Sequence, residues 1–288
     1  MRTHLDCLPC LLNQALKAAR AATADEELHR HALNAVAAII PELPMDMKPP
    51  EIAQQCYRLV YEVIGDNDPF RGAKDAANRA ALGVYPKLKQ IVAGSEDPLL
   101  TACKLAIAGN SIDLGPGFDY GSMDDIVGTA VRSPLAVDRY AQFAADVKTA
   151  RGILYLGDNA GETVFDRVLI EELRRAGDAA IMFVVRDRPV INDATLDDAL
   201  VAGIDDVAEV VSSGSDAPAT ILSQCSTALL ELYHAADVIV SKGQGNYESL
   251  SEEPENIYFF LRAKCELVAE LLGVAVGDAV LERGRAAD

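Results

Sequence analysis

The first half of the chain has the spacing of apolar residues that is typical of amphipathic helices. Such residues recur three and four positions apart in two stretches, at Leu11, Leu12, Ala15, Leu16 and Ala19 and then at Leu28, Ala32, Val36 and Ile39. A third stretch starts near Pro50, a residue that suits the first turn of a helix, and a fourth spans 75–88. No convincing run of β-branched residues precedes residue 150. The pattern predicts an all-α domain over residues 1–147.

The second half, residues 148–288, alternates short apolar runs with helical patterns. The apolar runs are Ile153–Leu156, Ala180–Val185, Val207–Val211, Val238–Val240 and Ile257–Phe260. The helical stretches between and after them are Thr163–Ala176, Thr195–Ala202, Pro218–Ala235 and Ala263–Leu272. Apolar strands that alternate with helices predict a mainly parallel sheet with helices on both faces. We therefore expect a three-layer α/β/α domain packed against the helical one.

Polar residues and glycines follow each predicted strand. Ligands of an open parallel sheet bind outside the carboxyl ends of the strands, so these residues are candidates for one site. The candidates are Asp158, Asn159, Glu162, Asp193, Ser213, Ser215, Lys242, Gly243, Gln244, Asn246, Tyr247 and Lys264. Ordinary turn chemistry explains one such loop, because Gly, Asn, Asp and Ser favour turns. Five loops in succession on one rim are more than a purely structural interpretation requires.

The oxygen-bearing candidates suit a hard divalent cation. Asp158, Asn159 and Asp193 offer carboxylate and amide oxygens, which Mg²⁺ and Mn²⁺ prefer as ligands. An amide among carboxylates keeps the charge of the site low enough for the ion to attract an anion. Taken singly, Asp158 and Asp193 each also suit the N-cap of the following helix.

Positive groups at the same rim favour an anionic ligand. Lys242 and Lys264 supply charge, and the 213–215 segment precedes a predicted helix whose first N–H groups form an anion site. Taken singly, Lys242 is most simply a solvated surface residue, and the 215–218 segment is an N-cap followed by proline. A metal, two lysines and a helix N-terminus together predict a phosphate-handling site.

The net charge of the chain disfavours some classes of binding partner. With 26 Lys and Arg against 44 Asp and Glu the formal net charge is −18, which disfavours binding to nucleic acid and to anionic membranes. A small phosphate ester remains compatible with this charge, because the predicted site has cations of its own. No apolar run approaches the roughly 20 residues of a membrane-spanning helix, and the first residues do not resemble a secretory leader. We therefore expect a cytoplasmic protein. The sequence does not predict an oligomeric state.

Several competing fingerprints are absent. The 157–162 segment lacks the glycine spacing of a dinucleotide-binding turn, and no nucleoside-triphosphate loop occurs. Phosphatases of the haloacid dehalogenase type have a second Asp two positions after the first, where this chain has Ala160. Two other functions stay open: an S-adenosylmethionine-dependent methyltransferase, which uses similar acidic strand ends, and a non-catalytic protein that binds phosphorylated metabolites. Release of inorganic phosphate would distinguish a phosphatase from the methyltransferase and from the binding protein.

A series of motifs in order along the chain resembles the metal-dependent damage-control phosphatases, a family first catalogued as domain of unknown function 89. The motifs are Leu5-Asp6-Cys7-Leu8-Pro9-Cys10, Asp68-Pro69-Phe70-Arg71 with Asn78, Ala106–Asp113, Gly157–Glu162, Ile191–Thr195, Ser213–Pro218, Lys242–Glu248 and Leu261–Cys265. The likeness covers nearly the whole chain, and the N-terminal cysteine pair points to the compact prokaryotic branch. Ala219 stands where relatives often have Gly.

The resemblance implies a helical domain packed on a Rossmann-like domain and a divalent ion (Mn, Mg, Co or Ni) held by Asp158, Asn159 and Asp193. It also implies substrate contacts from Glu162, from the Gly243–Tyr247 segment and from Lys264. Relatives remove phosphate from small phosphorylated metabolites, including sugar phosphates and damaged or surplus cofactor precursors.

The mechanism that we expect is in-line attack by water on the phosphorus. Asp158, Asn159, Asp193 and Glu162 are the catalytic candidates. Asp193 and Glu162 would orient the water, while Lys242 and Lys264 neutralise the charge on the phosphate.

Two motifs of the helical half are compatible with more than one role. Asn110 and Asp113 follow an apolar run and either reach over the rim to contact the leaving group or simply end a helix. Cys7 and Cys10 form a C-x-x-C pair at the start of a predicted helix. Ordinary packing, half of a zinc site and a redox pair are all compatible with that spacing.

Overall fold

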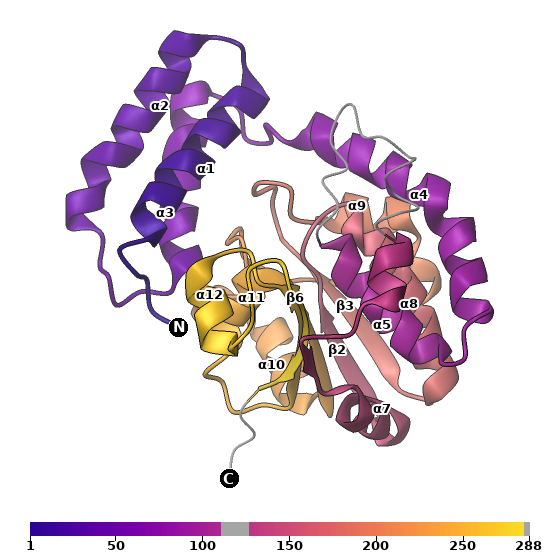
Figure 1. The fold of residues 1–288 in the computed structure, drawn as a ribbon. Helices are drawn as coiled ribbons and strands as arrows, with labels where there is room; N and C mark the ends of the chain where they lie inside the picture. Colours follow the sequence, from indigo (N-terminus) through magenta and orange to yellow (C-terminus); the bar gives the residue numbers. More distant parts are fainter. Residues whose placement is uncertain (111–126, 285–288) are drawn as a thin grey trace.

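The computed structural model describes residues 1–110 and 127–284. Its first three helices form a small bundle that stands apart from the sheet in Figure 1. These helices are α1 (Cys7–Ala22), α2 (Glu26–Ile39) and α3 (Pro49–Ile64), with the short 3₁₀-helix η1 (Ile40–Glu42) after α2. Ala15, Val36 and Val60 lie in the core of the bundle, as the spacing of apolar residues predicts.

The following helices belong to the layer that covers one face of the sheet. They are α4 (Arg71–Ala93), α5 (Pro98–Gly109) and α7 (Tyr140–Thr149). Leu88 of α4 and Ile107 of α5 share one hydrophobic core with Ile153 and Phe183 of the sheet. Helices of the predicted 1–147 domain therefore share a hydrophobic core with the sheet. The domain boundary at residue 147 stays a prediction.

The sheet has seven strands in the order β1-β7-β6-β5-β2-β3-β4. The strands are β1 (Val137–Asp138), β2 (Gly152–Leu156), β3 (Ala180–Val185), β4 (Glu209–Ser212), β5 (Val238–Lys242), β6 (Ile257–Arg262) and β7 (Ala279–Arg283). Strands β2 to β6 pair in parallel, and β7 runs antiparallel to β6. The chain leaves β2 toward β3 on one side and returns to β5 on the other. This reversal places the topological switch point, where α/β sheets bind ligands, between β2 and β5.

The two faces of the sheet have separate cores. Ile153 and Tyr155 of β2 face α4, α5, α7, α8 and α9, whereas Leu154 and Leu156 face α10, α11 and α12. The helices not yet bounded are α8 (Glu162–Ala176), α9 (Leu196–Ala202), α10 (Thr227–Ala235), α11 (Gly243–Leu250), α12 (Glu266–Leu272) and the 3₁₀-helices η2 (Ile204–Asp206) and η3 (Leu222–Gln224). This alternation confirms the predicted three-layer α/β class.

Two local predictions were wrong, and two strands were not predicted. The helix expected from Pro218 begins only at Thr227, where Ser226 caps it. In the preceding segment the Thr220 N–H donates to Asn246 Oδ1 of α11 instead of to a helical carbonyl. Residues 243–250 form α11 rather than a loop. The edge strands β1 and β7 are too short, or too mixed in polarity, for the pattern to reveal.

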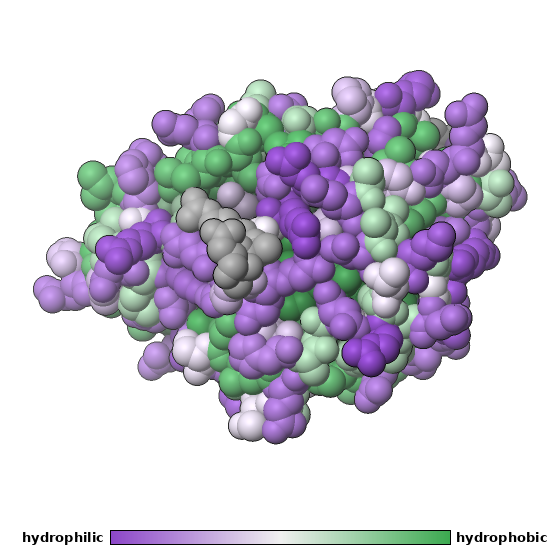
Figure 2. Space-filling view, turned by 90° about the horizontal axis from the view of Figure 1, so that it is seen from below, coloured by the Kyte–Doolittle hydropathy of each residue, from purple (hydrophilic) through white to green (hydrophobic). Residues whose placement is uncertain are grey.

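The face of the molecule seen from below in Figure 2 is mainly hydrophilic. Figure 2 shows hydrophilic side chains over most of one face, interrupted by separate hydrophobic patches. No helix of residues 1–110 and 127–284 is both long enough and apolar enough to cross a membrane.

Candidate active site

The loops after β2 and β3 pair with each other at the carboxyl edge of the sheet. The Ala194 N–H donates to the Asp158 carbonyl at 2.8 Å, and the Ala160 N–H donates to the Asn192 carbonyl at 2.9 Å. Asn159 and Asp193 lie opposite each other in this short antiparallel bridge. The pairing brings the three predicted metal ligands together from two different strand ends.

Two amide side chains hold two carboxylates at the centre of the site. Asn110, at the end of α5, donates from Nδ2 to Asp158 Oδ2 at 2.6 Å and to Glu162 Oε2 at 2.8 Å. Asn159 Nδ2 donates to the same two oxygens at 2.8 and 3.2 Å. Asn110 thus joins the site from the helical half. Asp113 lies outside the described residues, so its predicted role stays a prediction.

Buried negative charge dominates the electrostatics. Burial, together with the nearby Glu162 and Asp193, raises the pKa of Asp158 to about 7, although Lys264 and Arg186 oppose this rise. Burial also raises the pKa of Asp193, although the adjacent Arg186 opposes this. The nearby positive charges therefore do not fully offset the negative charge of the buried carboxylates.

Lys242 lies beneath these carboxylates and is fully buried. Its Nζ donates to Glu162 Oε1 at 2.5 Å, to Asp166 Oδ1 at 2.6 Å and to the Ala106 carbonyl at 3.0 Å. Burial lowers the pKa of Lys242, but the two carboxylates outweigh burial and raise it. An ammonium has three donors, and all three are engaged. We therefore assign Lys242 to holding Glu162 and Asp166, instead of the phosphate contact expected from the sequence.

Lys264 is the predicted cation that remains exposed. Its N–H donates to Gln244 Oε1 at 2.7 Å, and Gln244 Nε2 donates to Glu248 Oε1 at 2.8 Å. The positive charge of Lys264 opposes the rise in the pKa of Asp158 and of Asp193. Its ammonium group therefore lies within electrostatic reach of both carboxylates. Lys264 is therefore placed to attract an anion.

The start of α11 requires a glycine. Gly243 has φ +80°, and a Cβ there would lie 2.0 Å from Asp158 Oδ2.

Asn246, three residues after Gly243, is fully buried and connects two loops of the site by hydrogen bonds. It donates from Nδ2 to the Lys242 carbonyl at 2.8 Å and accepts at Oδ1 from the Thr220 N–H at 2.7 Å. Tyr247 packs instead into the core below α11.

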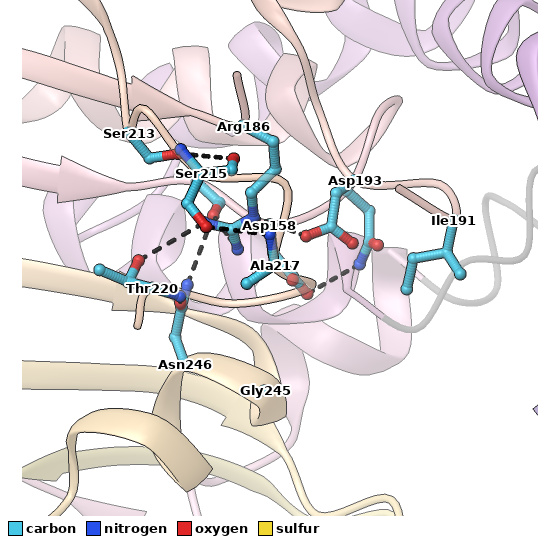
Figure 3. A network of polar contacts seen from close by, with 12 residues as sticks. Asp158, Arg186, Ile191, Asp193, Ser213, Ser215, Ala217, Thr220, Gly245 and Asn246 are labelled. Atoms are coloured by element: carbon cyan, nitrogen blue, oxygen red, sulfur yellow. Dashed lines mark hydrogen bonds and ion pairs between the residues drawn. The ribbon is translucent and has the colours of Figure 1, made fainter. Parts of the chain in front are cut away.

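The two candidate serines shape their own loop. Ser213 Oγ donates to the Ser215 carbonyl at 3.1 Å, and Ser215 Oγ accepts from the Ala217 N–H at 3.1 Å. Figure 3 shows both beside Arg186 and Thr220. The helix N-terminus expected behind them is absent from this described segment, because Asp216 is held by Arg58 and Gln54 of α3.

Arg186 and Asp166 are site residues that the sequence analysis did not select. Arg186 is 2% exposed and donates from Nε to Asp193 Oδ2 at 2.7 Å. Its place directly after β3 is the same signal that identified the other candidates. Asp166 lies one turn into α8, where the sequence has no feature that distinguishes it from a surface acid.

Comparison with known proteins identifies the family. A sequence model described as the damage-control phosphatase ARMT1-like domain matches residues 3–280, nearly the whole chain. The chain belongs to this family. The damage-control phosphatase PH1575 of Pyrococcus horikoshii is 34% identical over 99% of both chains. A damage-control phosphatase of Archaeoglobus fulgidus is 35% identical over 95% of this chain and 96% of that protein.

The fold of this family member agrees with a solved relative. The crystal structure of the DUF89 family protein PH1575 from Pyrococcus horikoshii superposes with a TM-score of 0.93 at 33% identity, covering 99% of this chain and 100% of that one. The comparison confirms both the predicted fold class and the resemblance drawn from the motifs.

The donor set of this damage-control phosphatase family member fits a hard cation. No group of three His, Cys, Asp or Glu side chains in the described ranges is arranged to hold an ion by itself. A cation at this position could be held by Asp158 and Asp193 only with a further ligand, and the amide oxygen of Asn159 is one candidate. Asn110 Oδ1 is also buried and has no hydrogen-bond partner among the described residues. Uncompensated carboxylates beside an unpaired oxygen are what a bound cation would satisfy.

The cysteine pair lies next to this site rather than in it. Cys10 is exposed and Cys7 half-buried at the start of α1, and both thiols are free. Each lies close enough to Cys265 and Glu248 to interact electrostatically, and burial raises the pKa of both thiols. No described contact decides between the three roles that the sequence leaves open.

A surface hollow of about 420 Å³ lies elsewhere, lined by Arg174, Ile181 and Glu209 among others. It is at the amino ends of β3 and β4, opposite the edge that carries the polar cluster. Ligands of parallel sheets bind at the carboxyl edge, so we place the site at the cluster.

Proposed function

We propose that this protein is a phosphatase that hydrolyses small phosphorylated metabolites, such as sugar phosphates or damaged or surplus cofactor precursors. One observation carries the proposal. Asp158, Asn159 and Asp193 meet beside the switch point of the sheet, in a chain of the damage-control phosphatase family. Two relatives that are named damage-control phosphatases support the same activity.

The same three residues would hold a divalent ion (Mn, Mg, Co or Ni). When bound, such an ion supplies Lewis-acid polarisation of a phosphate oxygen and offsets the charge of the phosphoryl group. Arg186 fixes Asp193 by one carboxylate oxygen, so the other oxygen can face a ligand. Asn110 Nδ2 likewise holds one oxygen of Asp158, Oδ2, and links it to Glu162 Oε2.

Glu162 and Asp193 are the residues best placed to orient the attacking water and accept its proton. Glu162 is 1% exposed, and Lys242 and two amide groups fix both of its oxygens. A carboxylate held this rigidly keeps a water in one orientation without reorganising during the reaction. Lys264, exposed at the rim, would draw the phosphate toward the carboxylates.

The direct test is phosphate release after metal is removed and restored. Protein stripped with EDTA should release no inorganic phosphate from an aryl phosphate or from a panel of sugar phosphates. Activity should return with at least one of Mn²⁺, Mg²⁺, Co²⁺ or Ni²⁺. Asp205→Asn, a change in an exposed acid at the opposite edge of the sheet, is the control and should behave like the wild type. No phosphate release with any of these ions would overturn the proposal.

The two alternatives predict a different result in the same assay. A methyltransferase would transfer a methyl group from S-adenosylmethionine and leave the phosphate ester intact. A non-catalytic binding protein would bind the ester without turnover. No contact among the described residues specifically favours either alternative.

Lys264→Gln should weaken substrate binding more than turnover. The side chain is exposed, so we expect KM for a sugar phosphate to rise roughly five- to tenfold with kcat nearly unchanged. Steady-state kinetics at low salt measures this, and added salt should shrink the difference between variant and wild type. Lys148→Gln, an exposed lysine on α7, is the control. A large fall in kcat with unchanged KM would argue against this role.

A further inference from the structure

A chain of hydrogen bonds behind the site joins α4, α8 and α9. Asn78 of α4 is 2% exposed; its Oδ1 accepts from the Gly161 N–H at 2.6 Å and its Nδ2 donates to Asp198 Oδ1 at 2.9 Å. Asp198 Oδ2 accepts from the Thr195 N–H at 3.0 Å and from Thr195 Oγ1 at 2.8 Å. The links run without a break from Gly161 through Asn78 and Asp198 to Thr195.

The two ends of this chain lie in the two loops that carry the site. Gly161 comes two residues after Asn159, and Thr195 comes two residues after Asp193. The loops already pair directly through two main-chain hydrogen bonds. The side-chain link from Asn78 to Asp198 is a second connection between them.

The local backbone shows why the first loop needs an outside partner. Gly161 is the N-cap of α8 with φ +77°, and the N3 residue, Val164, has an apolar side chain that cannot accept from the N-cap N–H as the Glu or Gln of a capping box does. Asn78 supplies the missing acceptor for the Gly161 N–H from α4. The link is buried at both residues, since Asp198 is 5% exposed, so water cannot easily replace either partner.

A cation completes the arrangement. Lys74 is 4% exposed, and its Nζ lies 3.4 Å from Asp198 Oδ2 and 3.5 Å from Asp68 Oδ2. Its charge offsets that of Asp198, which burial would otherwise make costly. The Asp68 motif and Asn78, which the phosphatase chemistry does not use directly, therefore belong to one buried network.

We propose that Asn78 and Asp198 are positioning residues that fix the loop of Asp158 and Asn159 relative to the loop of Asp193. They act through the backbone, since no described contact joins either residue to those three side chains. The catalytic consequence rests on the proposed function, but the effect on the loops does not.

The hydrogen-bond pattern permits a test by exchange of the two side chains. Asn78→Asp alone sets two carboxylates against each other. Asp198→Asn alone turns an amide N–H₂ toward either Asn78 Nδ2 or Thr195, so one donor loses its acceptor. The double variant Asn78→Asp/Asp198→Asn reverses donor and acceptor and can remake every link. Asn78→Ser, which adds no charge, serves if Asn78→Asp does not fold.

Three measurements read out the exchange. Each single variant should bind Mn²⁺ about 10- to 100-fold more weakly in calorimetry, with a comparable fall in kcat, because residues that orient ligands have effects of this size. In metal-free protein the amides of 157–162 and 193–196 should exchange hydrogen faster. The double variant should recover most of all three losses. Tyr258→Phe, which removes a hydrogen bond from β6 to Asp146 of α7, is the control and should change none of them.

Several results would overturn the proposal. Single variants that lower the melting temperature but leave Mn²⁺ affinity and loop exchange unchanged would show a merely structural role. A double variant that regains stability without regaining the loop protection would do the same. If the wild type neither binds Mn²⁺ nor releases phosphate, the proposed function fails. Hydrogen exchange in the metal-free protein then decides the positioning role alone.

Discussion

Asp158→Asn should abolish phosphate release while making the metal-free protein more stable. Asn is nearly the same shape and keeps an oxygen at the position of Oδ2, which accepts both amide hydrogen bonds of the site. It removes the charge that would hold a cation. We expect kcat/KM to fall by more than about 100-fold, beyond the effect of residues that only orient ligands.

The gain in stability follows from the pKa of Asp158. Burial and neighbouring carboxylates raise this pKa from 3.8 to about 7. The folded protein therefore holds a proton that the unfolded chain releases, and stability is lost as pH rises from about 4 to about 7. At pH 8 the wild type bears the full cost of the buried charge and Asp158→Asn does not.

Two assays on the same purified protein measure stability and activity. Thermal unfolding in EDTA at pH 8 reports stability, and phosphate release in separate samples with Mn²⁺ reports activity. The melting temperature of Asp158→Asn should exceed that of the wild type at pH 8, and the difference should shrink toward pH 5. Asp205→Asn controls for the loss of an acid as such. An active Asp158→Asn enzyme would remove Asp158 from the catalytic group.

Lys242→Met should destabilise the protein more than any other single change considered above. Met has a similar length and suits an apolar site, but it leaves Glu162 and Asp166 buried without their cation. Breaking a buried ion pair by removing one partner costs about 3–5 kcal/mol. Activity should also be lost, because Glu162 would no longer be fixed by Lys242.

The pH dependence tests the cause of that loss. Burial raises the pKa of Asp166 to about 6 even though Lys242 lowers it, so without Lys242 the group should keep its proton to higher pH. Protonated carboxyls tolerate burial, and the stability deficit of Lys242→Met should therefore be smaller at pH 5.5 than at pH 8.

Denaturant unfolding at the two pH values gives the comparison, with the exposed Lys148→Met as the control. Adding Asp166→Asn to Lys242→Met removes one of the unpaired charges and should recover part of the stability. A deficit that does not depend on pH, together with no recovery in the double variant, would mean that lost packing causes the destabilisation.

The fold class and the strand ends proposed to form the site could be predicted from the pattern of residues along the chain. Hydrophobic periodicity is a local property, and it located β2, β3 and β5 because buried parallel strands are continuous apolar runs. Once those strands are placed, the rule that ligands bind at their carboxyl ends selects Asp158 and Asp193. The motif resemblance then pointed to the family that the comparison confirmed.

The contacts of several of those residues depend on how distant parts of the chain pack together. Lys242 was expected at the rim but lies below Glu162, 80 positions away in the sequence, and Asn110 reaches Asp158 across 48 positions. Ser215 does not lead into a helix, because α3 holds the neighbouring Asp216. Partners so far apart are set by how the layers pack, and no local pattern of apolar and polar residues encodes which buried charge meets which.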